Sequence, residues 1–373
     1  MCSNNLLITL HLVKEEDSPW FNLIEIVPEV FDKVFSFLDH ESLLNCSLVC
    51  QSWNNFIGSS SNLMRKFKAK IKLKDIHESV EIAKVINNSK GKIFHLEITY
   101  ENSFIGRIKN FWDSDRGVLP CPLVETFQKK SFLVKNLVSL SIMTAEVSEI
   151  SNILSKSVNL KELKLSAMRL TETDWLKVTA SPIFKLKTLT ITSDSVTASC
   201  HKGLHHFLKT QLDSLETFKI IKGVLETESM NAVLEMKRLK LFEITDTAIG
   251  TIKKAGSLKS LEELQAFGEQ MEDSLIFHSI PNLKKLTMQY LNQQSVQKIG
   301  SHLNKLEELH IKSIELDDIT NRKLFPSLQL VKVEVFVELQ FQELILLQIA
   351  DNPNNFAQCL YDEICKAPHI NWC

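Results

Sequence analysis

The residues that could bind a metal ion gather in one short stretch of the sequence. Cys200 and His201 are followed by His205 and His206, and the spacing of His201 and His205 would place two ligands on one face of a helix. The stretch lacks the Glu of a His-Glu-x-x-His motif, and no further matched ligand accompanies it. A solvent-exposed helix explains these residues better than a metal site, so we expect no metal and no cofactor.

Other catalytic motifs are absent from the sequence. It holds no G-x-x-x-x-G-K-[ST] loop for phosphate and no G-x-S-x-G turn for a nucleophilic serine. Acidic pairs such as Glu262-Glu263 and Glu307-Glu308 fall between the leucines of a repeated pattern, which predicts solvated strand faces and not acid–base pairs. We therefore expect a protein that is not an enzyme.

The composition is typical of a folded, soluble protein. The 373 residues are 44% hydrophobic and 24% charged, and the net charge of -2 argues against a basic, nucleic-acid-binding surface. The eight cysteines form no Cys-x-x-Cys pair, which favours reduced thiols and a cytoplasmic or nuclear location. No apolar run approaches the roughly 18 residues of a membrane span, so no membrane partner is expected.

Three short amphipathic helices are predicted between Val27 and Ile57. Pro28 suits the first position of a helix, where its missing N–H costs nothing, and apolar residues then recur at helical spacing as far as Leu38. Asp39 can cap the second helix. Segments below about 40 residues usually need a metal, a disulfide or a partner for stability. We interpret this stretch as a module that binds a partner protein.

This stretch resembles the F-box. The resemblance is carried by Val27-Pro28-Glu29, Leu38-Asp39, Leu43-Leu44, and Leu48-Val49-Cys50 followed by Trp53. Val27 stands where leucine is commonest, and Gln51-Ser52 replace the usual basic pair. The resemblance implies docking to the Skp adaptor of Skp–cullin–F-box ubiquitin ligases. The adaptor-binding residues that it implies are Val27, Pro28, Val30, Phe31, Val34, Leu38, Leu43, Leu44, Val49 and Trp53.

Nine L-x-x-L-x-L units follow at steps of 22 to 29 residues. They begin at Leu137, Leu160, Leu186, Leu215, Leu239, Leu261, Leu283, Leu306 and Leu328, and Ile93-Leu96-Ile98 fits as an earlier unit. This period resembles that of leucine-rich repeats. Each unit supplies a strand and a return segment, and stacking the units buries one continuous core. Apolar spacing predicts helical return segments at 149–156, 229–236 and 295–303.

The order of these parts predicts an α/β chain. We expect a small three-helix F-box followed by a leucine-rich-repeat solenoid, with parallel strands on the concave face and mostly helical return segments outside. The turn asparagine or cysteine that often follows such strands is missing here, which indicates an irregular array. The expected domains are a leader at 1–23, the F-box at 24–57, a linker and first irregular repeat at 58–92, repeats at 93–335 with an insertion near 101–122, and a C-terminal cap at 336–373.

Target binding is expected on the concave face, because strand side chains alternate and those between the leucines point away from the core. The predicted target-binding residues are Lys164, Lys219, Ile221, Glu243, Phe267, Gln289 and His310. The family resemblance then implies a substrate receptor in ubiquitin-dependent protein degradation. Its partners would be a Skp-type adaptor, through it a cullin scaffold, and an unidentified target protein. A non-degradative scaffold that uses the same two surfaces is the alternative.

Overall fold

The computed structural model describes most of the chain between residues 28 and 348. The described ranges are 28–73, 76–88, 92–100, 122–146, 151–169, 172–179, 184–193, 203–249, 257–267, 275–292, 299–315, 330–336 and 342–348. The chain divides into two compact units, one formed by residues 1–140 with 156–159 and the other by residues 141–155 with 160–373. The predicted leader, most of the predicted insertion and most of the predicted C-terminal cap lie outside the described residues.

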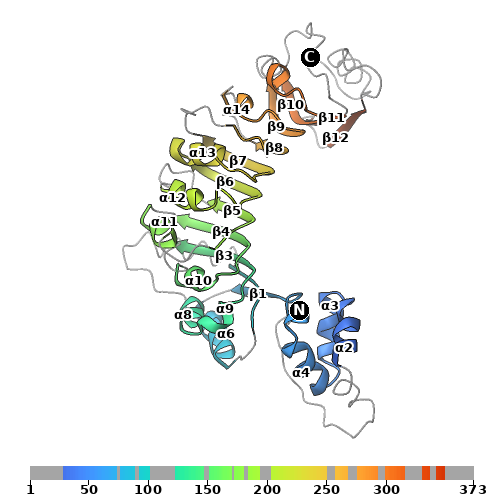
Figure 1. Cartoon of the computed structure of the whole chain (residues 1–373), viewed down its shortest axis with the longest axis vertical. Coiled ribbons are helices and arrows are strands. Elements are labelled where there is room, and N and C mark those ends of the chain that lie inside the picture. Colours follow the sequence, from blue (N-terminus) through green and yellow to red (C-terminus); the bar gives the residue numbers. More distant parts are fainter. Residues whose placement is uncertain are drawn as a thin grey trace. The chain divides into compact units, whose positions relative to one another are not determined.

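The described part of the first unit begins with four helices (Figure 1), namely α2 (Pro28–Ser36), α3 (His40–Ser47), α4 (Gln51–Ser59) and α5 (Ser61–Met64). Asp39 caps α3, as its sequence position predicts: its carboxylate accepts a hydrogen bond from the Ser42 backbone N–H at 2.8 Å. That bond lowers the pKa of Asp39, because it stabilises the charged form. Asp32 on α2 accepts a hydrogen bond from the Ser60 hydroxyl at 2.6 Å, which joins the first helix to the start of the fourth.

These helices share a small hydrophobic core. Phe35, Leu43, Ile57 and Leu63 are buried, and Phe31, Leu38, Cys46, Trp53, Phe56 and Phe67 pack against them. The rings of Phe35 and Trp53 meet edge to face with centroids 5.2 Å apart. The fourth helix was not predicted, and through Leu63 it closes a core that three helices alone would leave open.

The rest of the first unit alternates strands and helices. Its elements are β1 (Lys68–Leu73), α6 (Ile76–Asn88), β2 (His95–Tyr100), α8 (Pro122–Lys129), α9 (Ser131–Val134) and the first residues of β3 (Ser139–Glu146). β1 pairs in parallel with β2, with Ile71 opposite Ile98. The region predicted as a linker and irregular repeat thus contains a regular strand and a helix. Strand β3 follows β2 directly in the order of the sheet.

In the second unit, described helices separate the strands as far as β7. Beyond β3 it contains α10 (Ser151–Lys156), β4 (Glu162–Arg169), α11 (Glu172–Thr179), β5 (Thr188–Ser193), α12 (Leu204–Thr210), β6 (Thr217–Leu225), α13 (Thr227–Leu234), β7 (Leu241–Ile249), β8 (Glu263–Phe267), α14 (Leu275–His278), β9 (Lys285–Asn292), β10 (Glu308–Glu315), β11 (Leu330–Phe336) and β12 (Gln342–Gln348). The pairs from β4 to β11 are parallel. The predicted class is confirmed: N-terminal helices precede an α/β repeat array whose strands follow chain order.

The leucines of each repeat form the core of the array. In the repeat of β5, Leu186, Leu189 and Ile191 are all completely buried, and the equivalent residues of the repeats of β3 to β10 are similarly shielded. The turn asparagine that the repeats lack has a local substitute in one repeat. There the buried Thr247 hydroxyl donates a hydrogen bond of 2.8 Å to the carbonyl of Thr245, satisfying a backbone group at the end of the strand core.

A buried glutamine links neighbouring repeats. Gln211 follows α12, and its side-chain oxygen accepts a hydrogen bond of 2.9 Å from the N–H of Leu186. Its amide nitrogen donates to the carbonyl of Phe184 at 3.1 Å. One side chain thus satisfies both the donor and the acceptor of a buried turn in the preceding repeat.

The last described strand of the sheet runs in the opposite direction to its neighbour. β12 pairs antiparallel with β11, with Val333 opposite Ile345. The strand direction thus reverses within the segment predicted as the C-terminal cap. In the described part of the chain, no helix is long and apolar enough to cross a membrane.

Candidate functional site

The first candidate surface is formed by hydrophobic side chains of the N-terminal helices. Val30, Val34 and Phe37 are 53%, 52% and 76% exposed, and their spacing places them along one side of α2 and the turn that follows it. Leu44, Leu48 and Val49, on α3 and after it, are also exposed. We call these six residues the apolar F-box surface. Large exposed apolar groups on so small a domain mark a contact with another protein.

The predicted adaptor-binding residues differ in their exposure. Val30, Val34, Leu44 and Val49 belong to the apolar F-box surface, and Pro28 is exposed at the start of α2. Phe31, Leu38 and Trp53 are partly buried against the core, and Val27 lies outside the described residues.

Leu43 requires a correction. It is 0% exposed at the centre of the helical core, so it stabilises the domain and offers no surface to an adaptor. Its neighbour Leu44 is 40% exposed, because successive residues of a helix point about 100° apart.

Two residues of the apolar F-box surface were not predicted as contacts. Phe37 is its most exposed member, and Leu48 is 62% exposed. The sequence carried a signal for both: Val30, Val34 and Phe37 are spaced by four and three residues, and Leu44 and Leu48 by four. These spacings define second apolar stripes on helices whose first stripes form the core.

The second candidate surface is the face of the sheet opposite the leucine core. In the strand register, Lys164, Thr190, Lys219, Glu243, Gln265, Thr287 and His310 stand opposite one another in a single row across β4 to β10. Ile221, Thr245 and Phe267 form part of the next row. Gln289 lies on β9 two residues beyond Thr287, so strand alternation places it in this second row. It is half-buried like Ile221 and Phe267. We call this the polar sheet face.

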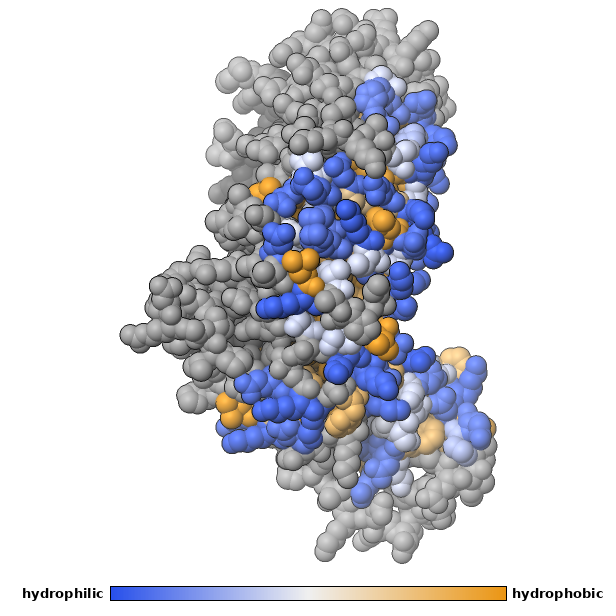
Figure 2. Space-filling model, turned by 60° about the vertical axis from the view of Figure 1, so that its left-hand side comes forward, coloured by the Kyte–Doolittle hydropathy of each residue, from blue (hydrophilic) through white to orange (hydrophobic). Residues whose placement is uncertain are grey.

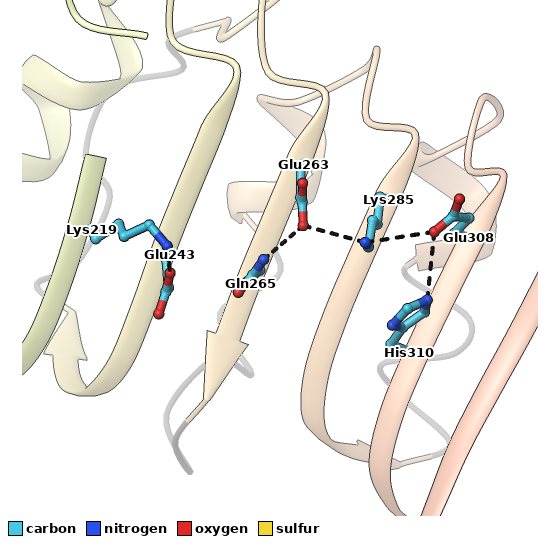
Figure 3. Close-up of polar contacts among 7 residues, drawn as sticks. All are labelled: Lys219, Glu243, Glu263, Gln265, Lys285, Glu308 and His310. Atoms are coloured by element: carbon cyan, nitrogen blue, oxygen red, sulfur yellow. Dashed lines mark hydrogen bonds and ion pairs between the residues drawn. The ribbon is translucent and has the colours of Figure 1, made fainter. Parts of the chain in front are cut away.

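Charged side chains on the polar sheet face pair across repeats (Figure 3). The Lys219 ammonium on β6 contacts the Glu243 carboxylate on β7 at 2.5 Å. Lys285 on β9 lies between Glu263 on β8, at 3.6 Å, and Glu308 on β10, at 3.7 Å. Exposed pairs of this kind contribute only about 0–1 kcal/mol to folding, so their main effect is to hold the side chains in fixed positions.

Two further groups extend this network. The Gln265 amide donates to Glu263 at 2.7 Å, and His310 Nε2 lies 3.5 Å from a Glu308 oxygen. Glu263, Lys285 and Glu308 were not among the predicted binding residues. Their signal was the alternation of charge at one repeat position, the residue before the second leucine, which reads Glu, Lys, Glu in successive repeats.

The histidine stretch has a structural setting on α12. His205 and His206 are half-buried there, and burial lowers the pKa of His205, with a further contribution from the neighbouring His206. His206 lies 4.0 Å from the Glu172 carboxylate on α11. Cys200 and His201 lie outside the described residues. Within the described ranges, no group of three or more His, Cys, Asp or Glu side chains could hold a metal ion.

Comparison with known proteins assigns the helical part of the first unit. The model of the F-box-like family matches residues 28–69. The F-box/SPRY domain-containing protein 1 of Aedes aegypti is 33% identical over 89 residues, which cover 22% of this chain and 34% of that protein. The match thus spans about a third of the relative. The F-box-like match at residues 28–69 ends beyond the predicted boundary at residue 57 and includes α5 and the start of β1.

Two solved structures have a distant similarity to this chain. An internalin from Listeria monocytogenes has 16% sequence identity and a TM-score of 0.38, covering 73% of this chain and 68% of its own. The yeast complex of Rad7 and Elc1 gives 15% identity and a TM-score of 0.37, with coverages of 77% and 70%.

The family match and the order of the sheet define the class of the chain. It carries an F-box-like domain at residues 28–69, and a parallel-strand repeat array follows. The resemblance stated from the sequence is thereby confirmed for both parts.

Proposed function

We propose that this chain is the substrate-recognition subunit of a Skp–cullin–F-box ubiquitin ligase and has no catalytic role of its own. The observation that carries the proposal is the apolar F-box surface, six large hydrophobic side chains exposed on a domain of the F-box-like family. Removing these apolar side chains from water is a favourable contribution to association with a partner. A Skp-type adaptor is the partner that this family of domains implies, and the cullin scaffold would be reached through it.

The polar sheet face is proposed as the surface for the target protein. Its side chains come from successive strands and are held by ion pairs, so they offer a fixed pattern of donors and acceptors. Binding there would keep a target lysine near a ubiquitin-conjugating enzyme elsewhere in the assembly, which raises the effective concentration of the reacting groups. We place the chain in the cytoplasm or nucleus, consistent with the free thiols of Cys46 and Cys50.

The test measures adaptor binding by a variant that changes only exposed residues. Val34→Ser, Phe37→Ser and Leu48→Ser together should weaken binding of a purified Skp-type adaptor at least a hundredfold, about 2.7 kcal/mol. The helical core should remain, because Phe35, Leu43, Ile57 and Leu63 are untouched. Binding is measured by isothermal titration calorimetry and folding by circular dichroism.

The control carries the same kind of change elsewhere. Val85, Val158 and Leu176 are also exposed hydrophobic residues, but they lie outside the F-box-like domain. Changing these three to serine should leave adaptor affinity unaltered. Equal affinity of the wild type and the F-box variant would contradict the proposal. Adaptor binding without co-precipitation of a cullin subunit would instead support a non-degradative scaffold.

A further inference from the structure

The turns that lead into strands β4 to β7 carry an unusual concentration of positive charge. In each turn the charged residues lie close to the first leucine of the repeat. Together these turns hold Lys161, Lys185, Lys187, Asp213, Glu216, Lys237, Arg238 and Lys240, with Glu235 at the start of the last turn, which makes six cations and three carboxylates. Their net charge is +3, while the whole chain has a net charge of -2. We call these residues, without Glu235, the basic edge.

Backbone hydrogen bonds fix the positions of these turns. The N–H of Lys187 donates to the carbonyl of Lys161 at 2.7 Å, and the N–H of Glu216 donates to the carbonyl of Lys187 at 2.8 Å. The N–H of Lys240 continues the ladder to the carbonyl of Glu216 at 2.8 Å. Parallel strands lie about 4.8 Å apart, so the cations before β5 and those before β7 originate about 10 Å apart.

The two carboxylates of the basic edge are already paired. Glu216 lies 3.4 Å from the Lys187 ammonium, and Asp213 lies 2.8 Å from that of Lys237. The hydrogen bond from Lys237 lowers the pKa of Asp213, with smaller contributions from Lys185 and Arg238, so Asp213 stays ionised.

The remaining cations are available to a partner. All are exposed, and the Lys185 ammonium has only a long contact of 3.5 Å to the carbonyl of Thr210. For Lys161, Arg238 and Lys240, no carboxylate of the described residues lies within ion-pair distance. The basic edge thus presents four positive side chains without an acidic partner, grouped before β4–β5 and before β7.

We propose that the basic edge binds an extended acidic segment of the target protein, with carboxylates three residues apart. This inference rests on the proposed function, because it names the chemistry of the target. In the polyproline II conformation three residues advance about 9.3 Å and return to the same side of the chain. That repeat matches the separation of about 10 Å between the two groups of cations.

A protein segment fits this surface better than nucleic acid. A continuous phosphate backbone would meet the carboxylates of Asp213 and Glu216, which stand between the two groups of cations. The chain also lacks the overall positive charge that characterises nucleic-acid-binding proteins. Hydrophobic residues are scattered among hydrophilic ones on the molecular face shown in Figure 2, so a partner of that face would meet mainly polar groups.

The test uses a fluorescein-labelled peptide of four Glu-Pro-Ser repeats and the full-length chain. Fluorescence anisotropy should show binding that weakens with added salt. A peptide of four Gln-Pro-Ser repeats should not bind. Lys185→Glu, Arg238→Glu and Lys240→Glu together should weaken binding of the Glu peptide at least tenfold. Lys70→Glu, Lys84→Glu and Lys92→Glu make the same change in charge on other exposed lysines and should have little effect.

Three outcomes would overturn this inference. They are equal affinities for the Glu and Gln peptides, equal losses in the two triple variants, and tighter binding of a single-stranded RNA oligonucleotide than of the Glu peptide. Adaptor capture is measured on the same proteins. Failure of peptide binding with adaptor capture intact rejects this inference alone, whereas loss of adaptor capture with peptide binding intact rejects the proposed ligase role.

Discussion

In the F-box-like domain, α2, α3 and the turns after them expose six large apolar side chains, whereas the polar sheet face of the repeat array carries mainly charged, amide-bearing or hydroxylated side chains. Phe37 and Leu48 are 76% and 62% exposed, while Lys219, Lys285 and Glu308 are already paired within the array. An apolar surface gains free energy from burial against any complementary shape. A preformed polar pattern gains little unless the partner matches its donors and acceptors. In the proposed ligase role, the first region would thus supply affinity and the second selectivity.

The largest effect is expected from adjacent leucines that have opposite roles. Leu43→Ala should destabilise the F-box-like domain by about 2–5 kcal/mol, because it leaves a cavity in a buried cluster. Leu44→Ala should change stability much less but weaken adaptor binding. Hydrogen–deuterium exchange over residues 28–64 measures the first effect, and calorimetric titration the second. Similar loss of exchange protection in both variants would remove the distinction between core and surface in this domain.

A smaller effect is expected at the buried link between repeats. Gln211→Ala leaves the N–H of Leu186 and the carbonyl of Phe184 without partners, so the free energy of unfolding should fall by about 3 kcal/mol. Adaptor affinity should not change. Gln265→Ala is the matched control, because Gln265 is half-buried on the polar sheet face. Urea denaturation followed by circular dichroism measures both variants, and equal midpoints for the two would contradict the assigned role of Gln211.

Much of the fold could be predicted because its main determinant is periodic. A leucine that must face the core recurs at the same place in every repeat, and each described unit of the pattern corresponds to a strand. The features that could not be predicted come from contacts between residues that are far apart in the sequence. Gln211 reaches a turn 25 residues earlier, and no local pattern distinguishes it from a solvent-exposed glutamine. The antiparallel direction of β12 is likewise set by tertiary pairing with β11.

The polar sheet face could be predicted more completely than the apolar F-box surface, because regular strand geometry decides the first and helix packing decides the second. Alternation along a strand is a strict geometric rule, so the row containing Lys219, Glu243 and His310 appears in the structure as the pattern indicated. A short helix gives no such certainty. Leu43 and Leu44 are identical residues in neighbouring positions, and only the packing of α3 against its neighbours decides which one is buried.

The ion pairs of the polar sheet face are expected to contribute little to stability. A double-mutant cycle of Lys219→Met and Glu243→Gln should give a coupling free energy of about 0.2–1 kcal/mol, because Lys219 remains partly exposed to solvent. The coupling should diminish in high salt. A coupling above about 2 kcal/mol would show that the pair holds the array together, and the interpretation of this face as a binding surface would lose its basis.

The smallest effect concerns the pH dependence of the array. Burial lowers the pKa of His302, and the neighbouring His278, whose ring centroid is 3.5 Å away, lowers it further. The unfolded chain, with an ordinary histidine pKa near 6.5, therefore binds a proton more readily than the folded chain does. His302 thus contributes stability that is fully present above the unfolded pKa and is lost as the pH falls through that value toward the folded pKa.

His302→Gln should consequently reduce the loss of stability between pH 7.5 and pH 5.5, measured as the change in the urea midpoint of the array. His40→Gln provides the matched control, because His40 is exposed on α3 of the F-box-like domain. If both variants lose stability with the same slope as the wild type, His302 titrates alike in the folded and unfolded chains. His302 would then give the array no pH-dependent change in stability, and sensitivity to acid would not distinguish the array from the F-box-like domain.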